Sequence, residues 1–235
     1  MGKLKHYGFF AILLVASVCI GYLVTLQISP DRAVLVAGII LVTLPLCYVI
    51  YNFERNKPSA FSIVLIALFA GAAVAGRTVL YLFPGVKPVA AIIIIGGICF
   101  GKEFGFLSGC MSMLVSNFIF SQGYWTVWQM FGMGLIGYLA GIFFYRIRIK
   151  KIWLVAVYTF VATTILYGFV VDTGSLLFYL GMRNLNFSEM WSVYAAGSIF
   201  NVTHGISATL FSTVLLKPLS RAADRVKQKI SVYKI

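Results

Sequence analysis

The stretch that decides the fold of this chain is Gln122-Gly123-Tyr124-Trp125-Thr126-Val127-Trp128-Gln129-Met130-Phe131-Gly132, with further glycines at Gly134, Gly137 and Gly141. At about 100° per residue, Trp125, Trp128 and Gln129 fall on one stripe near the outer end of a membrane helix. The later glycines fall on the opposite stripe, where a neighbouring helix can approach closely. The aromatic stripe is either an interfacial tryptophan belt or one wall of a ligand site. Gln129, one turn deeper, favours the ligand site.

The composition excludes an ordinary soluble domain, because 61% of the residues are hydrophobic and only 11% are charged. Nineteen basic residues against six acidic ones give a formal charge of +13. In a soluble protein this surplus would indicate nucleic acid. Here the charges lie between apolar segments, so we expect no nucleic-acid partner. The cysteines lie singly in apolar runs, without the spacing of a metal site.

Apolar windows long enough to cross a bilayer occur near 7–27, 33–53, 61–83, 104–121, 124–145, 152–172 and 190–216. A shorter run, 88–100, lies between Pro88 and Gly101, and we interpret it as a short span enclosed by its neighbours. The sequence therefore predicts an all-α integral membrane protein with about eight transmembrane helices.

The distribution of Lys and Arg predicts the orientation of these spans. With eight spans both termini lie on the same side. If that side is cytoplasmic, the basic residues that fall outside are only Arg32, Arg77, Lys87 and Arg183. The tail, 219–235, places apolar residues on one face and Lys and Arg on the other, which is typical of a helix in the anionic membrane interface. We therefore expect a multi-pass cell-membrane protein with cytoplasmic termini.

The third span carries Ala67, Gly71 and Ala75 at four-residue spacing. Such a face lets two helices touch backbone to backbone. The spacing alone leaves open whether the partner helix belongs to this chain or to another subunit.

Polar residues near the outer ends of the spans form a second candidate site. An Arg in or at the lip of a span is costly unless it faces a polar cavity or a partner, which selects Arg77, with Tyr81 one turn away. Asn117 and Gln122 end the fifth span, and Asn201 and His204 share a stripe of the last. We place Asn117 beside the lip and the last two opposite the Trp stripe. A helix-packing role for His204 stays open.

The longest predicted connection is the outer loop from Asp172 to Met190. Its apolar patch, 176–180, could be a lid over the pocket or a short interfacial helix.

All six acidic residues fall at span ends, in loops or in the tail. A proton- or sodium-coupled carrier usually needs an acidic group within the membrane, and the predicted spans contain none.

Catalytic and cofactor motifs are missing. Residues 96–103 approach the phosphate-loop pattern, but Glu103 replaces the hydroxyl that would hold Mg²⁺, and the loop positions form an apolar span. No metal or cofactor is expected, and an intramembrane enzyme using His204 is the weaker alternative. A pocket without a means of energising transport indicates a binding subunit that other subunits drive. An autonomous membrane facilitator is the other alternative.

From Phe61 to Pro218 the chain resembles the substrate-binding (S) component of energy-coupling-factor (ECF) vitamin transporters. The likeness lies in the small-residue third span, the loop 83–88, and the segment 101–109 leading into Ser116-Asn117. The stretch 122–132 resembles a motif of a branch that includes corrinoid (cobalamin-type) transporters, although Val127 stands where Pro is expected. Two extra spans also precede the usual six.

The resemblance implies a six-helix substrate-binding core at 57–218, after two additional helices at 1–56 and before the tail at 219–235. It implies capture of a vitamin or related small molecule from outside a bacterial cell. A transmembrane coupling subunit and two cytosolic ATPase subunits would drive uptake, as in an ABC importer. The resemblance also assigns Ala67, Gly71 and Ala75 to contact with the coupling subunit.

Overall fold

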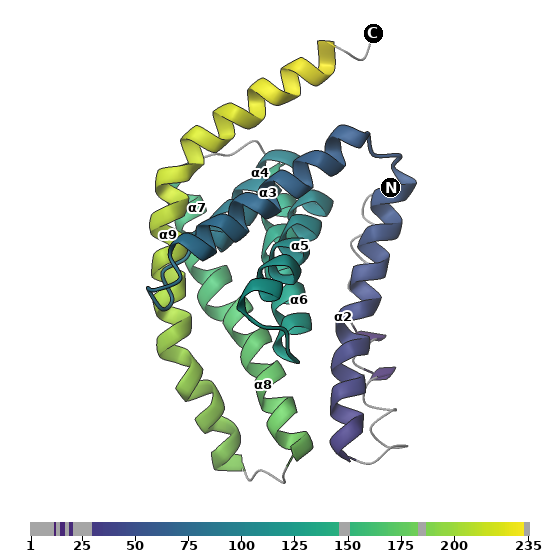
Figure 1. The fold of residues 1–235 in the computed structure, drawn as a ribbon, viewed down its shortest axis with the longest axis vertical. Coiled ribbons are helices and arrows are strands. Elements are labelled where there is room, and N and C mark those ends of the chain that lie inside the picture. Colours follow the sequence, from purple (N-terminus) through teal and green to yellow (C-terminus); the bar gives the residue numbers. More distant parts are fainter. Residues whose placement is uncertain are drawn as a thin grey trace.

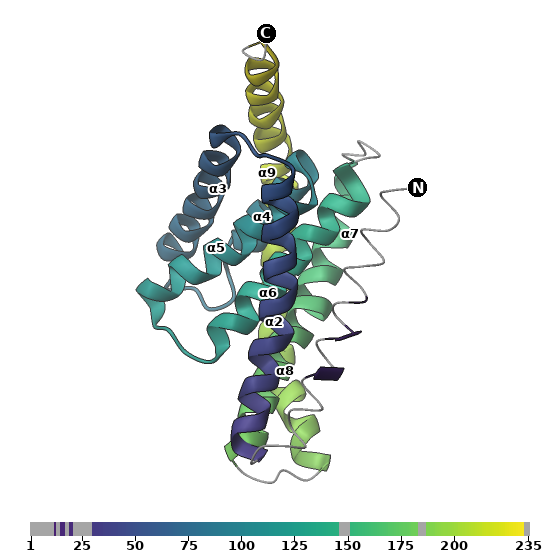
Figure 2. The ribbon, with the colours of Figure 1, turned by 90° about the vertical axis from the view of Figure 1, so that its right-hand side faces the viewer.

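The computed structural model describes residues 30–145, 151–182 and 187–232, with a few positions between 12 and 20. Throughout these ranges the regular structure is helical (Figures 1 and 2). The elements are α2 (Pro30–Arg55), α3 (Ala60–Val79), α4 (Val89–Phe100), α5 (Lys102–Phe120), α6 (Trp125–Ala140), η1 (Gly141–Tyr145), α7 (Ile152–Val161), η2 (Ala162–Tyr167), α8 (Gly168–Met182) and α9 (Phe187–Val232). The segments η1 and η2 are single π-helical turns that continue α6 and α7.

Within the described residues, six helical segments are long and apolar enough to cross a membrane. They are Gly38–Arg55, Ala60–Val79, Lys102–Phe120, Trp125–Tyr145, Ile152–Phe178 and Ser188–Lys229. The predicted short span at 88–100 is also a helix, α4. The first predicted span, 7–27, lies outside the described ranges except for isolated positions. The prediction of an all-α, multi-pass membrane protein is confirmed.

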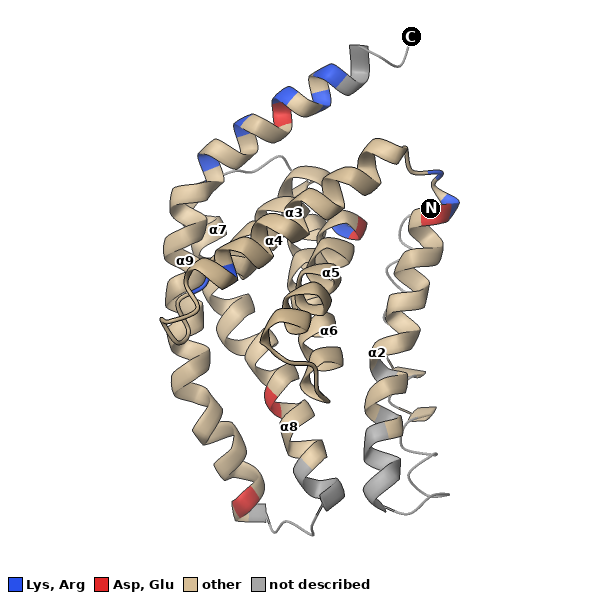
Figure 3. Cartoon of the chain, in the orientation of Figure 1, with Lys and Arg blue, Asp and Glu red and all other residues tan. Residues whose placement is uncertain are grey.

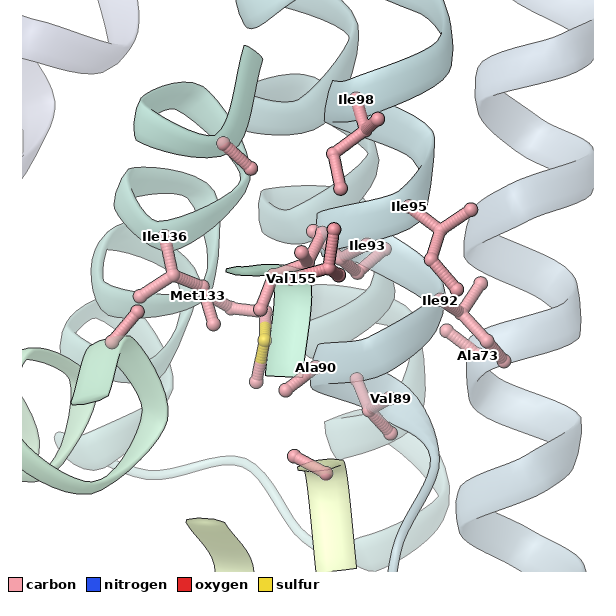
Figure 4. Close-up of a cluster of buried hydrophobic side chains, with 14 of the residues drawn as sticks. Ala73, Val89, Ala90, Ile92, Ile93, Ile95, Ile98, Met133, Ile136 and Val155 are labelled. Atoms are coloured by element: carbon pink, nitrogen blue, oxygen red, sulfur yellow. The ribbon is translucent and has the colours of Figure 1, made fainter. Parts of the chain in front are cut away.

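Helix α4 forms the centre of the bundle. Every residue from Val89 to Cys99 is buried, and α3, α5, α6 and α9 all pack against it. Figure 4 shows Ile92 and Ile95 beside Ala73 of α3, and Met133 and Ile136 on the opposite side. Pro88 lies just before the helix, and Gly101 ends it with a φ of 104°, a conformation that favours glycine. The prediction of a short helix enclosed by its neighbours is confirmed.

Glycines bring α4, α5 and α6 into backbone contact. A Cβ atom added at Gly97 of α4 or at Gly105 of α5 would collide with the carbonyl oxygen of Gly137 on α6. One turn along, a Cβ at Gly109 would lie 2.6 Å from the carbonyl oxygen of Met133. These three helices therefore form a tightly packed unit, as the glycine stripe on α6 predicts.

The predicted outer loop from Asp172 to Met190 is wrong. Helix α8 continues to Met182, and α9 begins at Phe187. Packing against α6 extends α8: Gly174 lies against the indole of Trp128, Leu176 is buried, and Phe178 stacks on Tyr124 with ring centroids 3.7 Å apart. The apolar patch is therefore part of a bundle helix, and Asp172 lies inside the candidate span Ile152–Phe178.

Helix α9 runs through Pro218 to Val232 without a break, so the predicted tail continues this helix. Its last part leans across one end of the bundle (Figure 1), where the Lys227 ammonium donates to the Cys99 carbonyl oxygen and lies 5.3 Å from the Phe100 ring centroid. Figure 3 shows basic residues gathered at this end, on α9, on the α2–α3 connection and at the start of α5. The opposite end carries few charges in the described part of the chain.

Candidate functional site

Eight segments of the chain contribute residues to a cavity of about 80 Å³. Its polar lining comes from α3, the α3–α4 connection, α6, η2, α8 and α9. The lining residues are Arg77, Lys87, Val89, Met113, Gln129, Met133, Tyr167, Val171, Asp172, Phe200, Asn201 and His204. Asn201 lies about 20 Å along α9 from its first residue, at 1.5 Å per residue. The cavity is therefore far from the end of this helix.

Arg77, near the end of α3, is held by α5. Its guanidinium donates to the Ser116 hydroxyl at 2.5 Å and to the Asn117 amide oxygen at 3.0 Å. It also lies 4.9 Å from the centroid of the Phe120 ring. These partners are neutral, and Arg77 forms no ion pair with any residue that the structure describes. The guanidinium charge is thus hydrogen-bonded but not neutralised.

Asn117 passes this network on to α6. Its amide nitrogen donates to the Thr126 hydroxyl at 3.1 Å and to the Gln129 amide oxygen at 3.0 Å. The Gln129 amide nitrogen has no hydrogen-bond partner within the described residues, and Gln129 lines the cavity. The network therefore orients Gln129 with a donor available to a ligand.

His204 of α9 is buried between aromatic rings. Its imidazole stacks on Tyr167 of η2 at 5.6 Å between ring centroids, and Phe200 lies 6.0 Å away. Both ring nitrogens lack a hydrogen-bond partner in the described part of the chain. Buried polar atoms are normally paired, so these nitrogens are candidates for ligand contact. The π-helical turn that carries Tyr167 is a feature often found at functional sites.

Asp172 is the acidic residue of the cavity. Its carboxylate accepts a hydrogen bond of 2.7 Å from the Asn201 amide nitrogen, which joins α8 to α9. Gly197, one turn earlier on α9, leaves room for this carboxylate, because a Cβ there would lie 2.5 Å from it. Asp172 therefore belongs to the site, although the sequence placed it in a loop.

Lys87 enters the cavity from the α3–α4 connection. Its backbone N–H donates to the Ser207 hydroxyl at 2.9 Å, which fixes the connection to α9. Its ammonium group has no hydrogen-bond or ion-pair partner among the residues described. Burial lowers the pKa of Lys87 below its ordinary value, and the charge of Arg77 lowers it further. The two cations therefore act on each other across the site.

The small residues of α3 lie on a different surface. Ala67, Gly71 and Ala75 are all exposed, and a Cβ at Gly71 would have no atom within 4 Å. This chain itself leaves the face uncovered in the part that the structure describes.

Comparison with known protein families matches residues 57–221 to the family described as "ECF-type riboflavin transporter, S component". The chain belongs to this family. No curated protein and no solved structure matches the chain. It is therefore an S component, a substrate-binding subunit of a membrane transporter. The family is a transporter family and not an enzyme family.

The structure brings together only part of the site that the sequence predicts for this S component. Arg77, Gln129, Asn201 and His204 line the cavity. Asn117 supports it through hydrogen bonds to Arg77 and Gln129.

Trp128 lies outside this cavity. It is buried between Gly38 of α2 and Gly174 of α8, and it borders a second, more apolar cavity of about 90 Å³. Trp125 packs on its own loop, with its ring against Gly123. A stripe on an isolated helix gives no information about α2, so the two indoles could not be separated from Gln129 by sequence alone.

Tyr81 and Gln122 are exposed outside the cavity. Tyr81 stacks on Phe120 with ring centroids 5.0 Å apart, and Arg77 approaches the same ring. Gln122 donates to the Leu114 carbonyl oxygen at 3.2 Å and so closes the turn after α5. Neither residue faces the lining.

Sequence reasoning missed Lys87, Tyr167 and Asp172 as site residues. Lys87 carried a detectable signal, because it is a lone cation in a connection bounded by Pro84 and Pro88. Asp172 was hidden by the wrong end of α8. The inward position of Tyr167 depends on a π-helical turn, which has no simple sequence pattern.

Proposed function

We propose that this S component captures a vitamin-type small molecule from outside the cell for ATP-driven uptake by partner subunits. The observation that carries the proposal is a cavity inside an apolar bundle whose lining includes polar groups without a hydrogen-bond partner in the described residues, on Lys87, Gln129 and His204. Ionisable groups inside a membrane protein are costly and mark binding or transport sites.

The exposed face of α3 supports the proposed partners. A coupling subunit that packs backbone to backbone needs small residues and free space, and Ala67, Gly71 and Ala75 offer both. The coupling subunit would be joined by two cytosolic ATPase subunits. We place the basic end of the bundle in the cytoplasm, because positively charged segments are retained there, and we expect both termini on that side. A bacterial cell membrane is the expected location.

The cavity also bears on the substrate. Ligand sites are usually about 300–1,000 Å³, so this cavity of about 80 Å³ must widen to admit a vitamin. A vitamin of one to three rings needs less widening than a corrinoid macrocycle. We therefore favour a small vitamin, and riboflavin is the first compound to test because the matched family is described by it. Corrinoid binding stays a prediction from the stretch 122–132.

Uptake measurements test this function. Cells that produce the chain with a coupling subunit and ATPases should accumulate labelled riboflavin. If riboflavin is not the substrate, they should accumulate another labelled vitamin. Cells with ATPase-inactive partners should not. Native mass spectrometry of the gently purified chain should identify a bound small molecule. If neither uptake nor a bound molecule is found across the common vitamins, the proposal is wrong.

Asp172 supports one alternative, an autonomous facilitator, since it places a carboxylate inside a span. Liposomes that contain the purified chain alone separate the two functions. An S component should bind the vitamin without carrying it inward, whereas a facilitator should equilibrate it across the bilayer.

A further inference from the structure

Hydrogen-bond donors without a partner line the cavity of this S component. The Gln129 amide nitrogen and the Lys87 ammonium have no partner in the described structure, and neither does the buried His204 ring. On the acceptor side, the Asp172 carboxylate accepts one bond from Asn201 and keeps further acceptor capacity, and a neutral His204 ring presents one donor and one acceptor. A ligand that satisfies this lining must supply acceptor atoms.

The charges of the lining point the same way. Arg77 and Lys87 contribute two positive charges, and Asp172 contributes one negative charge, so one cation is left uncompensated when His204 is neutral. Arg77 has only neutral hydrogen-bond partners, and the Lys87 ammonium has none among the described residues. A buried charge without a counter-ion is unfavourable. A bound anion would remove this cost and would form charge-assisted hydrogen bonds.

We propose that the ligand of this S component carries a carboxylate or phosphate group, which binds in the cavity beside Lys87 and Arg77. Gln129 and His204 supply further donors to the same ligand. The proposal rests on the proposed function, because it names the chemistry of the molecule that this site captures. It also assigns to Lys87 the role of the main charge contact, since Arg77 is already held by α5.

Matched pairs of compounds test the charge without knowledge of the natural ligand. The pairs are riboflavin 5′-phosphate with riboflavin, pyridoxal 5′-phosphate with pyridoxal, nicotinate with nicotinamide, and biotin with its amide. Thermal unfolding of the purified full-length chain in a neutral detergent finds the pairs that bind, and calorimetric titration measures their affinities. The phosphate and carboxylate pairs distinguish the two kinds of anion.

We expect the anionic member of at least one pair to bind about tenfold or more tightly than its neutral counterpart, as charge-assisted bonds are stronger than neutral ones. In Lys87→Gln this preference should fall to near one, and Lys87→Arg should restore it. Lys217→Gln is the matched control, because Lys217 is an exposed lysine of α9 outside this cavity. The unfolding curve of each variant shows whether it is folded. If Lys87→Gln does not fold, the two single variants Lys87→Arg and Arg77→Lys are compared for the same anion preference instead.

The outcomes separate the two proposals. If neutral members bind as well as or better than anionic ones, the ligand is not anionic, but the chain still binds a small molecule. If no member of any pair binds, this inference is overturned, and the uptake and native mass spectrometry measurements decide the proposed function separately. Dioleoyl-phosphatidylglycerol serves as a separate probe. Stabilisation by this lipid and by no free anion would assign the cations to a lipid headgroup and overturn the inference.

Discussion

Arg77 of α3 donates a 3.0 Å hydrogen bond to the amide oxygen of Asn117 on α5, and the same amide donates to Gln129 of α6. One side chain thus connects three helices and directs two cavity residues. Apolar contact fixes how close these helices lie, but the amide network fixes which polar atoms face the cavity. This arrangement makes Asn117 a positioning residue.

Replacing Asn117 with Leu should reduce both stability and ligand affinity. The change keeps a similar volume but leaves Arg77 and Gln129 with fewer partners, and an unsatisfied buried group costs about 1–3 kcal/mol. Thermal unfolding and calorimetric titration measure the two effects. Asn52→Leu is the control, since it removes one bond to the Tyr48 carbonyl oxygen on α2. Equal losses of affinity in both variants would contradict the positioning role.

His204→Phe should separate binding from folding. Phenylalanine keeps the stacking on Tyr167 and removes two buried nitrogens that have no partner. Stability should stay the same or rise. Affinity for the ligand should fall about tenfold, because the loss of one hydrogen bond of about 1.4 kcal/mol corresponds to that factor. Unchanged affinity in the folded variant would return His204 to a packing role.

Trp128→Ala should destabilise the bundle by about 3–5 kcal/mol, as expected for removal of a large buried aromatic side chain. The indole fills the space between Gly38 and Gly174, so α2 and α8 would each lose a packing contact. Trp125→Ala should cost much less, since that ring is only half-buried. Chemical or thermal unfolding checks the order. A lower ligand affinity with unchanged stability would instead place Trp128 in the binding site.

Gly71→Leu should leave ligand binding intact and abolish ATP-driven uptake. A Cβ at this position has no atom of the described chain within 4 Å, so we expect the added side chain to affect only a partner that packs there. Uptake with the coupling and ATPase subunits, and affinity in detergent, are measured together. Ala196→Leu puts the same bulk on an exposed position of α9 and should transport normally. Normal uptake by Gly71→Leu would remove α3 from the proposed interface.

Ligand affinity should decrease as the pH rises, and the decrease should begin at a lower pH than the ordinary pKa of a lysine would predict. The lowered pKa of Lys87 means that its ammonium loses its proton at a lower pH, and the protonated form is the one that attracts an anion. The other charged or titratable groups of the cavity are Arg77, Asp172, Tyr167 and His204. Titrations across the alkaline range check this. In Lys87→Arg the decrease should move to higher pH, because arginine stays protonated.

The sequence predicted the helices of this S component better than their ends. Apolar length identified α3, α5 and α6, and the short run at 88–100 was recognised from its flanking Pro88 and Gly101. The predicted end of α8 was wrong because Asp172 and Gly174 locally favour a loop. Packing against Trp128 and Tyr124 outweighs that local preference, and such contacts between distant segments are not visible in one sequence.

The sequence predicted several of the polar residues of the candidate site, but it did not predict how they are arranged. Arg77, Gln129, Asn201 and His204 stood out because polar residues are rare in apolar spans. The separation of Trp128 from Gln129 follows from the position of α2, for which helix periodicity gives no information. Lys87 reaches the cavity only because Ser207 fixes its connection to α9.

Helix α4 has a consequence for how the protein is made. Its 12 residues span about 18 Å, less than the roughly 30 Å of hydrocarbon in a bilayer. Inserted alone, such a segment would leave its polar ends in lipid. We therefore expect the nascent α4 to remain beside the insertion machinery until α5 and α6 have emerged. The glycine contacts would then close around it, so that this part of the chain enters the bilayer as one assembled group.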